Sequence, residues 1–199
     1  MGEPGVSWRS TEQLAQRVGS LAWLEGRLFG VCGAWACDPG SEPDGESDAP
    51  AETRVFLAGV SRHHAELAAG WQDRLPVRAG VDRAALVVAP PGPAARVLER
   101  LEAGSPALRL FGLVEVVLPR LLQSYRDEVD LASPVAEAPF IALLRRAIFE
   151  VDREVTRGSD VIHRQPGGSE QWKKVASEGE AIQQLFTNAG GIFPAAWAS

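Results

Sequence analysis

Four residues of this sequence combine metal-binding side-chain chemistry with a position inside an apolar helical stripe. They are Glu25, His64, Glu115 and Glu150. Glu25 interrupts the nearly all-apolar segment LAWLEGRLFGVCGAWAC, and Glu115 interrupts a second apolar face in the same way. A buried carboxylate without a partner is very costly, so each must meet a cation, an imidazole or a metal ion. Carboxylates and imidazoles also suit iron and manganese. The four residues therefore make a candidate metal site.

Long amphipathic helices are predicted to position these residues. Apolar residues recur at steps of three or four, which is the spacing of one helical face. Pro119 lies inside the third long helix and predicts a kink at the level of Glu115, because proline cannot donate the helical hydrogen bond. The four long helices are predicted at 10–37, 50–73, 106–130 and 134–157, with further helices at 94–103 and 169–188.

Counting along the predicted helices places the four residues near one level. Glu25 lies 13 residues before the first connection and His64 lies 13 residues after its end. Glu115 and Glu150 lie 18 and 17 residues on either side of Ser133. Because paired antiparallel helices rise equally per residue, we expect all four side chains to meet near the middle of the bundle.

The connections distinguish this bundle from other helical folds. Residues 130–133 make a short turn, and 38–52 form an acidic loop rich in Pro, Gly and Ser. Residues 74–93 contain four prolines and no helical period. A connection of that length can run from one end of a bundle to the other. One crossover between two helical hairpins is typical of one class of four-helix bundle.

With this helix order, crossover and set of placed acids, the sequence resembles the ferritin-like superfamily over residues 10–157. The resemblance implies an all-α fold, a ferritin-like four-helix bundle with one long crossover, here followed by an additional C-terminal helix. The bundle would occupy residues 1–165, and the C-terminal helix with its aromatic tail would occupy 166–199 and pack on it.

The resemblance also implies a cofactor and a chemistry. Such bundles often hold two metal ions through one Glu from each of two helices and a Glu-x-x-His pair from each of the other two. In this sequence the metal ligands would be Glu25, His64, Glu115 and Glu150, and the metal iron or manganese. The implied activity is that of an oxidase or hydroxylase, with no individual residue identified as catalytic.

The sequence departs from the family pattern at two positions. Ser61 stands three residues before His64, where the family has Glu, and Arg153 stands three after Glu150, where it has His. Only four of six ligands are present, and Arg153 offers an ion pair to Glu115 or Glu150 instead. Two functions therefore stay open: a di-metal enzyme, and a metal-free, non-catalytic bundle that acts as a binding or assembly module. Replacement ligands in less suitable positions are Glu66, Asp152, Glu154, Asp160 and His163.

Composition argues against several other classes of protein. The 199 residues, 45% of them hydrophobic and 23% charged, are typical of one soluble domain. No apolar run reaches the ~18 residues of a membrane span, and the first residues lack a signal-peptide pattern. Cys32 and Cys37 are poorly spaced for a disulfide, which predicts free thiols and a cytoplasmic location. The net charge of −6 arises from the six acids of 38–52, and no basic face for nucleic acid is expected.

Two segments are candidates for contact with a partner. The acidic loop 38–52 is expected to be a solvated connection, with docking to a protein partner as the alternative. Phe193 and Trp197 follow two glycines, and we expect them to fold back onto the bundle. The alternative is that this tail mediates a homodimer or binds another protein.

Overall fold

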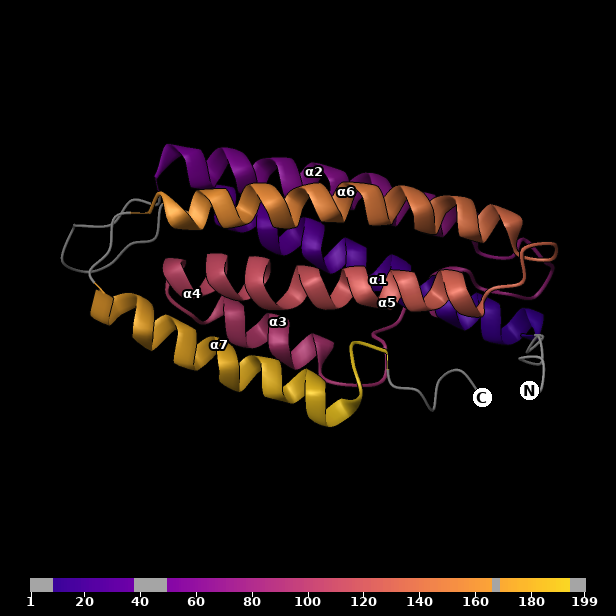
Figure 1. The fold of residues 1–199 in the computed structure, drawn as a ribbon. Helices are drawn as coiled ribbons and strands as arrows, with labels where there is room; N and C mark the ends of the chain where they lie inside the picture. The colour runs from indigo at the N-terminus through magenta and orange to yellow at the C-terminus, as the bar shows by residue number, and fades with distance from the viewer. Residues whose placement is uncertain (1–8, 38–49, 166–168, 194–199) are drawn as a thin grey trace.

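The computed structural model describes residues 9–37, 50–165 and 169–193, and throughout these ranges the regular structure is helical, without a strand (Figure 1). The predicted all-α class is therefore confirmed. The elements are α1 (Thr11–Cys37), α2 (Ala51–Arg74), η1 (Ala84–Leu86), α3 (Ala94–Glu102), α4 (Pro106–Phe111), η2 (Gly112–Val117), α5 (Leu118–Leu131), α6 (Ala138–His163) and α7 (Ser169–Ala189).

The long helices pack side by side along most of their lengths. α1 packs against α2, α2 against α6, and α6 against α5. The elements α4, η2 and α5 follow one another without a break and form the third long helical rod (Figure 1). Their apolar faces meet in one core, whose largest fully buried members include Trp71, Tyr125 and Leu28. The ends of the predicted helices agree with the observed ones to within a few residues, except for the fourth, predicted at 134–157, because α6 begins at Ala138 and ends at His163.

Local signals in the sequence account for two of the helix starts. The Ser10 N–H donates to Gln13 Oε1 and the Gln13 N–H donates to Ser10 Oγ, which is the reciprocal capping box at the start of α1. Ser105 Oγ accepts from the Leu108 N–H, and Pro106 occupies the first turn of α4. Both caps satisfy backbone donors that a helix start leaves without partners.

The connection between α2 and α3 passes directly over α1. A Cβ atom added to Gly19 would lie only 1.9 Å from the Leu86 carbonyl oxygen, so only glycine permits this approach. Gly33 also lies close to a neighbour, because a Cβ added there would lie 3.0 Å from Ser61 Oγ. At Gly26 and Gly30 an added Cβ would meet nothing within 4 Å.

α7 and residues 190–193 cover the side of the third rod that faces away from α6. α7 packs against α4, η2 and α3 (Figure 1). Beyond Gly190 and Gly191, both at positive φ, Ile192 is buried and Phe193 packs partly buried against the core, as expected for a tail that folds back. Trp197 and residues 38–49 of the acidic loop lie outside the described residues. Among the described helices none is long and apolar enough to cross a membrane.

Candidate functional site

A histidine between two carboxylates lies at the centre of the bundle. The His64 Nδ1–H donates to Glu25 Oε2, and His64 Nε2 lies 3.3 Å from Glu154 Oε2, within ion-pair distance. Glu25 and His64 are fully buried and Glu154 is 4% exposed. The predicted match in level between Glu25 and His64 is confirmed by this contact. The third member of the triad, Glu154, was predicted to be worse placed than Glu150, and that prediction was wrong.

Three different helices position the triad. Glu25 lies on α1 between the buried Leu21 and Leu28, and His64 lies on α2 between the buried Val60 and Leu67. Apolar residues one turn away on each helix shield the charged groups from water. The triad is therefore held in a low-dielectric interior, where a charge without a partner would be costly.

The electrostatics of the triad favour a bound proton. Burial alone would lower the pKa of His64, but the charges of Glu25 and Glu154 outweigh it and raise the pKa to about 10. Burial raises the pKa of the Glu25 carboxyl, although the neighbouring His64 opposes this shift. Both shifts have the same sign, so the buried unit holds protons more tightly than the unfolded chain does. At neutral pH His64 is an imidazolium between two acids.

The neighbouring histidine extends the triad toward the surface. His63 Nδ1 lies 3.0 Å from Glu154 Oε1 and 4.0 Å from Glu150 Oε2. The His63 side chain is 20% exposed, whereas that of Glu154 is 5% exposed. Glu154 thus contacts one histidine with each carboxylate oxygen and links the buried His64 to the outer His63. Glu150 contacts only this outer part.

Glu115 does not join the other predicted ligands. Its side chain is exposed, and its Oε1 accepts a hydrogen bond of 3.0 Å from Ser159 Oγ. The cause is η2, a π-helical segment that ends with the Leu118 N–H bonded to the Leu113 carbonyl. The wider π turn changes the direction of the side chains relative to a regular 3.6-residue helix. The predicted apolar face that contains Glu115 is therefore interrupted, and Glu115 faces outward.

Glu150 was favoured over Glu154 because the start of the fourth helix was placed too early. The sequence predicted that helix from residue 134, but residues 134–137 form a turn and α6 begins at Ala138. The Ser133 N–H donates to Glu137 Oε2 within this turn. Because this turn takes up four residues before α6 begins, the position on α6 that reaches the centre of the bundle moves by about one helical turn, from residue 150 to residue 154.

The sequence did contain a signal that favours Glu154. The buried positions of α6 include 144, 147, 151, 154, 158 and 161, which alternate steps of three and four. Glu154 lies on that stripe, whereas Glu150 lies beside it. Choosing the stripe by its regular alternation, and not by counting from the loop, would have identified the correct carboxylate.

The two positions that depart from the family pattern have ordinary structural roles. Ser61 Oγ donates to the Phe29 carbonyl at 2.9 Å and so joins α2 to α1. The Arg153 guanidinium lies 5.4 Å from the Phe149 ring centroid. The expected ion pair of Arg153 with Glu115 or Glu150 is absent from the part of the chain that the structure describes.

The remaining replacement ligands lie at the surface. Glu66 pairs with Arg146 at 2.8 Å, and Asp152 lies 3.4 Å from Arg126. His163 Nδ1 lies 2.6 Å from the Ser159 carbonyl oxygen, outside the core. None of these three side chains reaches the buried triad.

The residues present do not fit a di-metal centre. Such a centre needs six ligands, and of the four predicted here only Glu25 and His64 meet in the core. Glu25 also occupies His64 Nδ1, so these two side chains contact each other in place of a shared ion. Within the described ranges no group of three or more His, Cys, Asp or Glu side chains is arranged to hold a metal ion.

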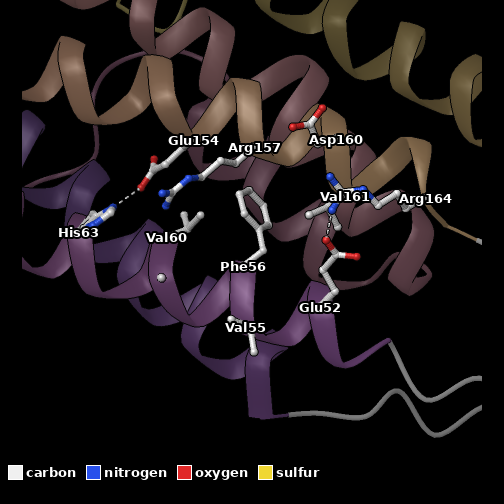
Figure 2. A pocket seen from close by; sticks show the side chains of 11 residues that line it. Glu52, Val55, Phe56, Val60, His63, Glu154, Arg157, Asp160, Val161 and Arg164 are labelled. Atoms are coloured by element: carbon white, nitrogen blue, oxygen red, sulfur yellow. Dashed lines mark hydrogen bonds and ion pairs between the residues drawn. The ribbon is translucent and has the colours of Figure 1, made fainter.

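A pocket opens where the triad approaches the surface between α2 and α6. Its volume is about 280 Å³, just below the usual range of small-molecule sites. The apolar side chains of Phe56, Val60 and Val161 form part of its wall, and His63 and Glu154 lie at one end (Figure 2). Other charged residues around it are Glu52, Arg157, Asp160 and Arg164. Sequence analysis did not predict this pocket, because it forms between α2 and α6, two helices that are far apart in the sequence and meet only in the fold.

Comparison with known proteins found no matching family model, no matching curated protein and no matching solved structure.

Proposed function

We propose that this chain is a metal-free, ferritin-like bundle that acts as a binding module for a small molecule, with the pocket between α2 and α6 as its binding site. The observation that carries the proposal is this pocket, with an apolar wall and a few charged groups beside the buried triad. Concave sites of this composition are the usual binding places for small ligands.

The ferritin-like part of the proposal rests on the order of the helices. Two pairs of neighbouring helices, α1 with α2 and the third rod with α6, are joined by the long connection from residue 75 to 93. This arrangement has the connectivity of a bundle with one crossover. The metal-free part rests on the triad, because an imidazolium held between two carboxylates offsets part of their buried negative charge without a metal ion.

The arrangement of the predicted ligands does not support oxidase or hydroxylase chemistry. The second half of the ligand set would have to come from Glu115 and Glu150. Glu115 is turned to the surface and Glu150 contacts only the outer His63. We therefore propose a structural role for the predicted ligand positions Glu25 and His64, and a binding function for the adjacent pocket.

The proposal is tested by ligand-observed NMR of the full chain against a collection of small aromatic and aliphatic compounds. Gly59 lines the pocket, and a Cβ added there meets nothing within 4 Å. Gly59→Leu therefore fills the pocket without a backbone clash and should abolish binding. Gly30→Leu is the matched control, because Gly30 is also an open helical glycine but lies away from the pocket.

Two results would contradict the proposal. Compounds that bind the wild type and Gly59→Leu equally well would place the binding site elsewhere. Stoichiometric iron or manganese in the purified protein, retained after dialysis against a chelator, would restore the metal site and remove the metal-free interpretation.

A further inference from the structure

The charged groups around the pocket differ in whether they already have partners. Glu52 pairs with Arg164, and Glu154 is held by His63 and His64. In contrast, Arg157 and Asp160 form no ion pair within the described part of the chain. These two residues are therefore the charges available to a ligand.

The two available charges do not face the same space. Figure 2 shows the Arg157 side chain extending along the pocket toward Val60 and the end formed by His63 and Glu154. The Asp160 carboxylate points away from Arg157, on the far side of the Phe56 ring. A ligand lying on Phe56 and Val60 would thus place its polar end near the Arg157 guanidinium.

The chemistry of the guanidinium selects the polar end of the ligand. Arginine binds a carboxylate or phosphate through two parallel N–H donors, and such charge-assisted hydrogen bonds are stronger than neutral ones. Glu52, Glu154 and Asp160 also surround the pocket and repel a second negative charge. A singly charged carboxylate fits this balance better than a phosphate dianion.

The apolar wall selects the rest of the ligand. Phe56, Val60 and Val161 offer one aromatic and two branched aliphatic surfaces next to Arg157. We infer that the pocket binds a small amphipathic carboxylate, with its carboxylate on Arg157 and its apolar body on Phe56, Val60 and Val161. This inference rests on the proposed function, since it names the ligand class of the same pocket.

The test compares three compounds that share one apolar body. They are 4-phenylbutyrate, 4-phenylbutan-1-ol and 4-phenylbutylamine, each titrated into the full chain by isothermal calorimetry. We expect the carboxylate to bind about tenfold more tightly than the alcohol, the size of one charge-assisted hydrogen bond at a partly exposed site. We expect the amine to bind most weakly.

Two arginine variants assign the selectivity to Arg157. Arg157→Gln should bind the carboxylate and the alcohol about equally. Arg153→Gln is the matched control, because Arg153 lies one turn earlier on α6, over Phe149 and outside the pocket, and should keep the tenfold preference. Because both arginines are exposed, neither change removes a core contact.

The outcomes separate this inference from the proposed function. Equal binding of all three compounds, or tightest binding of the amine, would overturn the carboxylate assignment and leave the pocket as a ligand site. Failure of all three, when the NMR collection yields a ligand that Gly59→Leu abolishes, would also overturn it. If no compound shows the Gly59 dependence, the proposed function itself fails.

Discussion

His64 is the residue on which the charge balance of the interior depends. It touches Glu25 and Glu154 from opposite ring nitrogens, and all three side chains are buried. Without its second ring proton, His64 would leave two carboxylates in a low-dielectric space with no neutralising charge. The folded protein therefore retains this proton to a higher pH than the unfolded chain does.

This proton makes stability depend on pH with a definite sign. The unfolded pKa of histidine is about 6.5, and in the fold the pKa of His64 is raised to about 10. The stabilisation is complete below the unfolded value and is lost as the pH rises toward the folded value. We expect the free energy of unfolding to fall by about 2 kcal/mol between pH 6.5 and 8.5, as measured by urea denaturation.

Two variants identify the source of this pH dependence. The double variant Glu25→Gln/His64→Gln removes the proton-binding pair and should flatten the profile, whereas His63→Gln should retain the wild-type slope. Staying below pH 8.5 keeps the ordinary thiol titration out of the measurement, since burial raises the pKa of Cys32. A wild-type stability that is constant or rises over this range would contradict the interpretation of the triad.

The same residues show what sequence reasoning could reach. The pairing of Glu25 with His64 could be predicted, because both lie on regular helices joined by one connection whose ends are well marked. Glu154 could not be found by counting, because the turn at 134–137 displaces the helix that carries it. The outward direction of Glu115 depends on a π turn, and a stripe drawn with 3.6 residues per turn misses such a turn.

At the scale of elements, the helices were predictable from their apolar periods and caps, but their close approaches were not. α2, α6 and the third rod meet around Gly158, where an added Cβ would lie 2.5 Å from Val114 and 2.9 Å from the Phe56 ring. In contrast, a Cβ atom added to Gly59 on α2 would meet nothing within 4 Å. Gly158 lies on the buried stripe of α6, but the sequence does not show how closely the neighbouring helices approach it.

This difference predicts opposite effects of one substitution. Gly158→Ala should lower the free energy of unfolding by about 1–2 kcal/mol, since overpacking outweighs the gain in helix propensity. Gly59→Ala should raise it by about 0.5–1 kcal/mol, since only the propensity changes. Urea denaturation of both variants measures the effects, and a stabilised Gly158→Ala would show that α6 and η2 are less tightly packed than described.

At the scale of the whole molecule, a second buried ionic cluster ties the chain together some distance from the triad. Glu128 on α5 contacts Arg9 at 2.6 Å and Arg17 at 2.8 Å, and Arg9 Nε lies 3.3 Å from Glu137. Arg17 precedes Glu25 on α1 by eight residues, or about 12 Å along the helix. The cluster joins the residues before α1, α1 itself, α5 and the turn before α6.

The cluster also reaches the C-terminal segment. The Arg17 guanidinium lies 5.2 Å from the Phe193 ring centroid, and the neighbouring Ile192 is buried. The sequence predicted that this tail folds back, because two aromatic residues follow a glycine pair. It did not predict the cation beneath Phe193, since Arg17 and Phe193 are brought together only by the packing of α7 on the third rod.

The cluster depends most on Glu128, because each of its two carboxylate oxygens pairs with a different buried arginine side chain. Glu128→Gln keeps the shape but leaves Arg9 and Arg17 with one fewer negative charge. Removing one partner of a buried ion pair costs about 3–5 kcal/mol, so we expect a loss of at least about 3 kcal/mol in the free energy of unfolding. Asp127→Asn is the matched control, because Asp127 is exposed on the same helix and its carboxylate accepts a hydrogen bond from the Gln123 side chain. Its effect should stay within about 0.5 kcal/mol. The loss in Glu128→Gln should persist in high salt, since a buried pair is screened less than an exposed one. Equal stabilities of the two variants would mean that the arginines find other partners and that the bundle does not depend on this cluster.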